Sequence, residues 1–212
     1  MPVVSSSPAR VYRGMSAVDR QASRRERLIA AGLQLFGTHG VPETRVDDIC
    51  AEAGLTKRYF YESFASPDDF IRAVVDSVIA DLTALVVPVI AASGWRNPRP
   101  ALSAFIGALL ADPRLVRLLV VETHNGVLAS RRQEFVDLAV DLWLSADPGA
   151  SKSPEHLPAQ RLMAHAMAGA AGEVALGWIN GRIDMTPEEI TDHLVRIFNR
   201  ITPSRPRVTS SD

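Results

Sequence analysis

The sequence predicts an all-α fold of about nine helices, and three observations support this. Apolar residues recur every three or four positions in several long stretches, which is the period of an α-helix. Capping residues and Pro or Gly breaks separate those stretches. No run of alternating apolar and polar residues bounded by hairpin turns occurs. With 212 residues, 47% of them hydrophobic, the chain is long enough to bury a substantial core.

The first two helices are each predicted from a capping signal and a glycine stop. A capping box, S-R-R-E, starts the first helix at Ser23, and Gly40 ends it. A second box, T-R-V-D at 44–47, starts a helix of at most three turns, because Gly54 supplies a left-handed stop.

The third helix is short, and most of the later ones are longer. Thr56 caps a helix over 57–63, and Pro67 takes the first position of a fourth helix that ends at Pro88 or in the segment just after it. Further helices are expected at about 101–111, after Pro113, at about 122–144, at about 159–180 and at 187–201.

These elements divide the chain into four parts. Residues 1–21, with three consecutive Ser and scattered Arg, should form a flexible basic arm. Residues 22–65 should form a three-helix domain, and residues 66–201 a larger helical domain for effector binding and dimerisation. Residues 202–212 should form a flexible tail.

Charge and cysteine content favour a cytoplasmic protein. The formal net charge of −1 excludes a uniformly basic nucleic-acid coat. Cys50 is the only cysteine, so no internal disulfide forms, and it is expected to be a small buried residue. The N-terminus lacks the apolar core of a secretory signal. The most apolar run, 84–92, is too short to span a bilayer, so no membrane partner is expected.

No pattern of an enzyme is present. The five histidines form no H-x-x-x-H pair, and no phosphate loop, G-x-S-x-G elbow or dinucleotide fingerprint occurs. The sequence therefore predicts neither catalysis nor a metal site nor a cofactor.

The stretch AGLTKRYFYESF at 53–64 has the plan of a helix-turn-helix, in which the second helix enters the major groove of DNA. Phe60 and Phe64, four residues apart, should pack inward with Ile49 and Phe36. The residues left outside are candidates for DNA contact, with Arg45 beside the start of the preceding helix: Arg45, Thr56, Lys57, Arg58, Tyr59 and Tyr61. The alternative from spacing alone is a generic helical bundle whose cations are merely solvated.

Residues 24–72 resemble the DNA-binding segment of the TetR family of bacterial transcriptional regulators. The positions that match are Leu35, Phe36, Gly40, Thr44, Ile49, Ala53, Gly54, Leu55, Thr56, Tyr61 and Phe64. The resemblance implies a homodimer on a palindromic operator in double-stranded DNA, a repressor function and a cavity for a small-molecule effector. It also implies that Tyr61 binds phosphate, while Arg58 and Tyr59 read bases.

Two departures from the family pattern weaken one DNA contact. The family often has Lys just after the cap of the fourth helix, where this chain has Pro67, Asp68 and Asp69. Ser63 replaces a common His or Tyr. The basic arm could supply the lost backbone contact. The alternative function is a dimeric ligand-binding or adaptor protein that no longer binds DNA.

The larger domain offers a predicted dimer interface and a predicted ligand pocket. Small residues on the helix containing 164–178 face an apolar stripe on the last helix, and the interface candidates are Ala164, Ala168, Ala171, Ala175, Ile190, Leu194, Ile197 and Phe198. Large apolar and nearby polar residues favour a hydrophobic effector, with these pocket candidates: Phe105, Leu109, Glu122, His124, Asn125, Phe135, Trp143, Met163, Met167 and Trp178. For both sets the alternative is ordinary intramolecular core.

Overall fold

The computed structural model describes residues 16–93, 97–121 and 157–201, with scattered helical positions between 130 and 145. All regular structure in these residues is helical, as predicted. The elements are α1 (Ala17–Thr38), α2 (Val46–Ala53), α3 (Lys57–Ser63), α4 (Pro67–Ser93), α5 (Arg99–Ala111), α6 (Pro113–Val116), the π-helix η1 (Arg117–Val121), α8 (Leu157–Ile179) and α9 (Pro187–Ile201). The expected helix at about 122–144 lies almost entirely outside the described residues.

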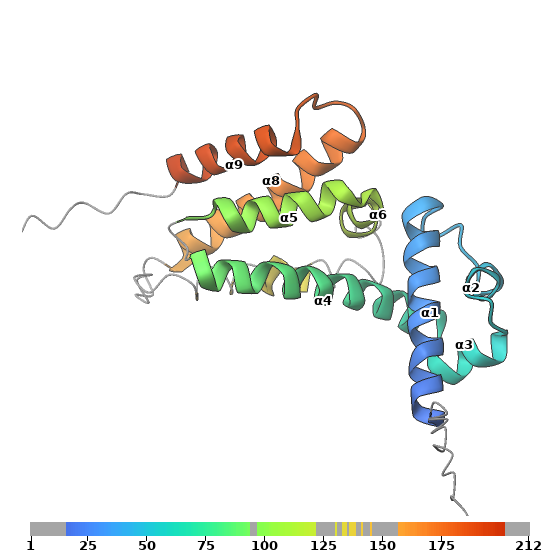
Figure 1. The fold of residues 1–212 in the computed structure, drawn as a ribbon. Coiled ribbons are helices and arrows are strands. Elements are labelled where there is room, and N and C mark those ends of the chain that lie inside the picture. Colours follow the sequence, from blue (N-terminus) through green and yellow to red (C-terminus); the bar gives the residue numbers. More distant parts are fainter. Residues whose placement is uncertain are drawn as a thin grey trace, which may run out of the picture.

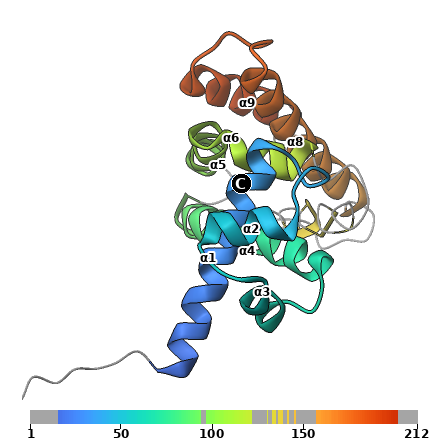
Figure 2. The same cartoon turned by 90° about the vertical axis from the view of Figure 1, so that its right-hand side faces the viewer.

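The helices form two units that share α1. Helices α2 and α3 pack on α1 at one end of the molecule, and α4 leads away from them (Figure 1). In the larger unit α5 packs between α4 and α9, and α8 contacts α5 and α9 (Figures 1 and 2). The last turns of α1 pack on α6 and η1, so α1 is the main element joining the two units.

Helix α1 begins earlier than the sequence predicts. Its N-cap is Ser16, whose hydroxyl accepts from the amide of Asp19, while the Asp19 carboxylate accepts from the Ser16 amide, both at 3.0 Å. The predicted start at Ser23 is therefore wrong, and residues 17–21 of the predicted flexible arm are helical. A capping box seven residues upstream already satisfies the free amides, so Ser23 lies inside the helix.

Helix α2 begins one residue later than the predicted capping box. Its N-cap is Arg45, whose amide donates to Asp48 Oδ2 at 3.0 Å. The Thr44 hydroxyl instead donates to the carbonyl of Gly40 at 2.7 Å and closes the loop between α1 and α2. Gly54 ends α2 in the left-handed conformation, with φ of 61°, as predicted.

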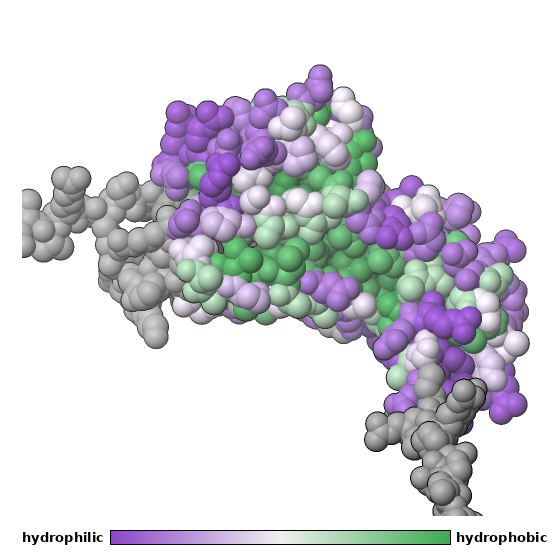
Figure 3. Space-filling model, viewed as in Figure 1, coloured by the Kyte–Doolittle hydropathy of each residue, from purple (hydrophilic) through white to green (hydrophobic). Residues whose placement is uncertain are grey.

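Helix α4 continues through Pro88 to Ser93, past the first predicted end point. By length and composition alone this helix could cross a membrane, which is weak evidence because core helices pass the same test. Five of its residues are buried in the core: Phe70, Val74, Val75, Val78 and Leu82. An apolar band over α4 and α5 is visible on one face of the molecule, next to the more hydrophilic α1–α3 unit (Figure 3).

The two units meet where Gly37 of α1 packs directly against Arg114 of α6. A Cβ at Gly37 would lie 2.3 Å from Cβ and 2.8 Å from Cα of Arg114, so only glycine fits there. Arg114 donates to Gln34 Oε1 at 2.6 Å and pairs with Asp112. Arg117 Nη1 donates to the carbonyl of Thr38 at 3.1 Å. The end of α1 is therefore held by the larger unit.

Candidate nucleic-acid interface

The angle between α2 and α3 is set by the Gly54 turn and by a residue of α1. The amide of Leu55 donates to the carbonyl of Cys50 at 2.8 Å, which completes the end of α2. Arg27 Nη2 donates to the carbonyl of Ala53 at 2.6 Å and approaches that of Gly54 at 3.4 Å. A cation at the C-terminal end of a helix is favourable for the helix dipole. Helix α1 therefore fixes the turn.

The inner side of α3 is aromatic, as predicted. Phe60 is fully buried and Phe64 is 5% exposed, and their ring centroids lie 5.6 Å apart. Phe70 of α4 contacts both rings, at 5.1 Å and 4.9 Å, and lies 5.8 Å from Phe36. Such tilted and edge-to-face pairs are the preferred geometry of aromatic rings. This cluster holds a seven-residue helix that would not be stable alone.

Five of the six predicted DNA-contact residues are exposed. Lys57, Arg58 and Tyr61 project from α3, and Tyr61 is 56% exposed although its ring rests edge-on against Phe60 at 5.2 Å. Thr56, the N-cap of α3, makes no side-chain capping bond, so its hydroxyl is not committed to the helix. Arg45 is exposed at the start of α2. The sixth residue differs in its surroundings.

Tyr59 is half-buried, and the guanidinium of Arg24 lies 4.5 Å from its ring centroid. This cation–π contact covers one face of the ring, so only part of Tyr59 remains for DNA. Arg25 lies over Phe64 in the same way, also at 4.5 Å. Together with Arg27, these α1 arginines hold α3 and its turn, whereas the sequence indicated only a basic tendency. The spacing of Arg24 and Arg27, one helical turn apart, was the available signal.

Both cations of α3 have carboxylate partners. Lys57 Nζ lies 2.8 Å from Asp47 Oδ1 of α2, and this hydrogen bond and charge raise the pKa of Lys57. Arg58 Nε donates to Glu62 Oε1 at 2.8 Å, which raises the pKa of the Arg58 guanidinium. Within residues 16–64, seven Lys or Arg are balanced by seven Asp or Glu. The α1–α3 unit therefore carries positive and negative charges in equal number, and the candidate interface on it is not uniformly basic.

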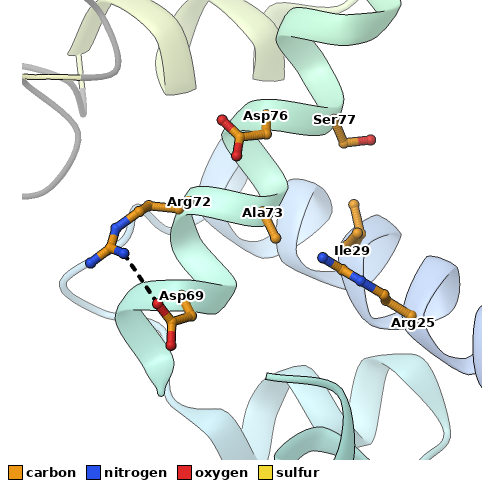
Figure 4. Close-up of a pocket in the computed structure, with 7 residues that line it drawn as sticks. All are labelled: Arg25, Ile29, Asp69, Arg72, Ala73, Asp76 and Ser77. Atoms are coloured by element: carbon orange, nitrogen blue, oxygen red, sulfur yellow. Dashed lines mark hydrogen bonds and ion pairs between the residues drawn. The ribbon is translucent and has the colours of Figure 1, made fainter. Parts of the chain in front are cut away.

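The start of α4 is acidic, as its sequence indicated. Ser66 caps the helix, accepting from the Asp69 amide at 3.1 Å and donating to Asp69 Oδ2 at 2.9 Å. Arg72 pairs with the other oxygen of Asp69 at 3.1 Å. An open groove between α1 and α4 has these residues on its walls: Arg25, Ile29, Asp69, Arg72, Ala73, Asp76 and Ser77 (Figure 4). None of the predicted pocket residues lines this groove.

The predicted pocket residues fall into two groups. Leu109 and Met167 are buried, Phe105 is half-buried, and Trp178 donates from Nε1 to the carbonyl of Met185 at 2.6 Å, bracing the turn between α8 and α9. The others lie outside the described residues, or have side chains outside them: Glu122, His124, Asn125, Phe135, Trp143 and Met163. The predicted ligand pocket therefore stays a prediction.

Most of the predicted interface residues are buried within a single chain. Five of them are at most 5% exposed: Ala171, Ala175, Ile190, Leu194 and Phe198. Ala168 is half-buried, and the side chain of Ala164 lies outside the described residues. Ile197 is 49% exposed, and Leu162, which was not predicted, is 72% exposed. An apolar surface on α8 and α9 is thus present, although the buried members of the set also serve the core.

The described residues contain no group of three or more His, Cys, Asp or Glu side chains that could hold a metal ion. Cys50 is buried as expected, and burial raises the pKa of its thiol, which makes it a poor nucleophile.

Comparison with known proteins supports both units. The sequence profile described as "Bacterial regulatory proteins, tetR family" matches residues 28–74. An HTH-type transcriptional repressor of Streptomyces coelicolor is 30% identical over 110 residues, which are 51% of this chain and 53% of that protein. The alignment thus spans about half the length of this curated relative.

Solved structures share the fold over most of the chain. The transcriptional regulator FadR from Bacillus subtilis, in complex with stearoyl-CoA, has a TM-score of 0.67 at 14% identity, covering 82% of this chain and 96% of its own. NalD, the secondary repressor of the MexAB-OprM multidrug efflux pump in Pseudomonas aeruginosa, has 0.62 at 17%, covering 85% and 96%. A TetR-like transcriptional regulator from Rhodococcus has 0.60 at 22%, covering 89% and 96%. Residues 28–74 thus match the tetR family of bacterial regulatory proteins, and the described helices share the all-α fold of these solved structures.

Proposed function

We propose that this protein is a DNA-binding transcriptional regulator, a repressor whose α3 reads the major groove of a palindromic operator. One observation carries the proposal. Helix α3 buries Phe60 and Phe64 in the aromatic cluster while Lys57, Arg58 and Tyr61 project into solvent from the same short helix. A recognition helix needs this division, because its buried face fixes its position and its exposed face makes the contacts.

Each exposed residue has a role that its chemistry allows. Arg58 can donate two hydrogen bonds to a guanine edge, and Tyr61 and Thr56 can donate hydroxyl hydrogen bonds to phosphate oxygens. Lys57 is placed for a phosphate or a base, and Arg45 for the backbone across the groove. Tyr59 would offer only the ring edge that Arg24 leaves open.

Two subunits are proposed to assemble through α8 and α9. The exposed Leu162 and Ile197 supply apolar surface on these helices, and Ala168 and Gly169 allow close approach. A two-fold dimer places its two recognition helices about one DNA turn apart, which matches a palindromic operator. Such a regulator acts where the chromosome is, in the bacterial cytoplasm.

A hydrophobic small molecule bound in the larger domain is proposed to release the operator. The apolar band over α4 and α5 supports an apolar effector (Figure 3), and the structurally similar FadR binds stearoyl-CoA. A ligand that binds one arrangement of the helices more tightly shifts the population toward it. The bonds from Arg114 to Gln34 and from Arg117 to Thr38 connect that domain to α1, and a differential affinity of a few kcal/mol would be sufficient.

Selection of operators from a pool of random duplexes tests this function. The wild type should enrich a palindrome and bind it with a steep dependence on salt. Arg58→Ala should relax base preference at one position of each half-site, whereas Tyr61→Phe should weaken all duplexes about equally. A dimer that enriches no duplex would instead favour a ligand-binding or adaptor protein, for which the acidic start of α4 is the supporting feature.

A further inference from the structure

We propose that Glu62 is a positioning residue for base recognition, which orients the guanidinium of Arg58 toward a guanine. The inference rests on the proposed function, because it requires α3 to lie in a major groove. Arg58 and Glu62 are one helical turn apart on the same face of α3, and Arg58 Nε donates to Glu62 Oε1 at 2.8 Å. Both side chains face solvent, with exposed fractions of 83% and 40%.

The atom that Glu62 engages determines what Arg58 can still do. A guanidinium has five N–H donors in a planar fork, and recognition of guanine O6 and N7 needs two of them. Because Glu62 takes the Nε hydrogen, the terminal Nη groups are left to meet the base edge. The ion pair therefore does not compete with recognition. It fixes the plane of the guanidinium and lowers the entropy lost when Arg58 contacts DNA.

The neighbouring ion pair has a different character. Lys57 pairs with Asp47 at 2.8 Å, but an ammonium group has no fixed plane, and this pair joins α3 to α2. Asp47 thus stabilises the motif, whereas Glu62 orients a base-reading group. The Glu62 charge has a second effect, because a carboxylate near the DNA backbone disfavours complexes in which Arg58 meets no guanine. Both effects raise selectivity.

The test compares discrimination at one base pair. The full-length wild type first selects a duplex, and Arg58→Ala identifies the position that Arg58 reads. Affinities are then measured for the selected duplex and for one with that guanine replaced. Glu62→Ala should reduce the ratio of these affinities about threefold to tenfold, because part of the discrimination by a bidentate contact is lost. Glu62→Gln keeps the acceptor oxygen and should fall between.

Two controls separate positioning from general charge effects. Glu52→Ala removes the same charge from exposed α2, where Glu52 makes no ion pair with the described residues, and should leave the ratio unchanged. In an Arg58→Lys background, Glu62→Ala should have no further effect on the ratio, because lysine has no guanidinium plane for Glu62 to fix. Circular dichroism should show the same helix content for all variants, because the substituted side chains are exposed.

Three results would overturn the inference while leaving the proposed function intact. In the first, Glu62→Ala leaves the ratio of affinities unchanged. In the second, Glu62→Ala lowers this ratio equally in the wild-type and Arg58→Lys backgrounds. In the third, Glu62→Ala changes discrimination equally at every base position. Failure of the wild type to enrich any duplex would instead remove the proposed function, and the inference with it.

Discussion

The two units of the molecule achieve order in different ways. In the α1–α3 unit a capping box starts α1, the left-handed Gly54 ends α2, and one aromatic cluster holds α3 in place. In the larger unit, α8 is apolar around much of its surface and gains its position from α5, α9 and η1. The difference teaches that the proposed DNA-binding face is built to a fixed geometry, whereas the larger unit depends on packing that the proposed ligand could alter.

The largest expected effect comes from breaking the aromatic cluster. Phe60→Ala should lower the free energy of unfolding by about 3–5 kcal/mol, because a fully buried ring that contacts Phe64 and Phe70 is lost. Urea unfolding followed by circular dichroism measures this. Tyr61→Ala, on the exposed side of the same helix, should cost under about 1 kcal/mol. Equal losses would mean that α3 is not held from its inner side.

The junction between the units is tested by two matched glycine substitutions. Gly37→Ala should cost about 1–3 kcal/mol, because its Cβ would overlap Arg114 and push α1 from α6. Gly107→Ala in α5 should stabilise the protein by about 0.5–1 kcal/mol, since its Cβ meets nothing within 4 Å among the described residues. The same sign for both variants in thermal melting would show that the close approach at Gly37 is not a constraint.

A smaller effect is expected from the arginine that fixes the turn. Arg27→Met should cost about 1–2 kcal/mol, because the hydrogen bond from a charged donor to the Ala53 carbonyl is lost. Hydrogen exchange should accelerate mainly in α2 and α3. Arg196→Met, an equal change of charge on exposed α9, should leave exchange in α2 and α3 as it is in the wild type. Uniform acceleration in Arg27→Met would argue against a local role.

The smallest effect involves pH at the junction. The hydrogen bonds from Arg114 hold the pKa of Asp112 below its ordinary value. A lowered folded-state pKa contributes stability above the unfolded pKa, about pH 4, and that stability is lost as pH falls through the folded value. Asp112→Asn should therefore cost about 1 kcal/mol at pH 7 and progressively less below about pH 4. Asn can still cap α6 as Asp112 does. A cost independent of pH would therefore mean that the charge of Asp112 does not supply this stability.

Local signals in the sequence predicted much of the α1–α3 unit and the last helix, α9. The bounds of α3 and α9, the left-handed Gly54 and the inward Phe60 and Phe64 follow from spacing within a few residues. The contacts that sequence reasoning missed join distant positions. Arg27 and Ala53 are 26 residues apart, and Arg114 and Gln34 are 80 apart. Periodicity identifies which face of a helix is buried but does not identify the element that it packs against. The roles of the α1 arginines and of Gly37 are therefore visible only in the structure.

The α1 arginines have a consequence for exchanging operator preference between related regulators. Grafting the seven residues of α3 alone would transfer Tyr59 without the Arg24 that lies over its ring. Grafting α2 and α3 together would also transfer the Gly54 turn without Arg27. The transplanted helix would then carry the same DNA-contact residues but would be tilted differently against its neighbours. The smallest segment expected to transfer operator preference is therefore α1 through α3. Chimaeras joined after Thr38 should lose more affinity for the operator than those joined before Ser16.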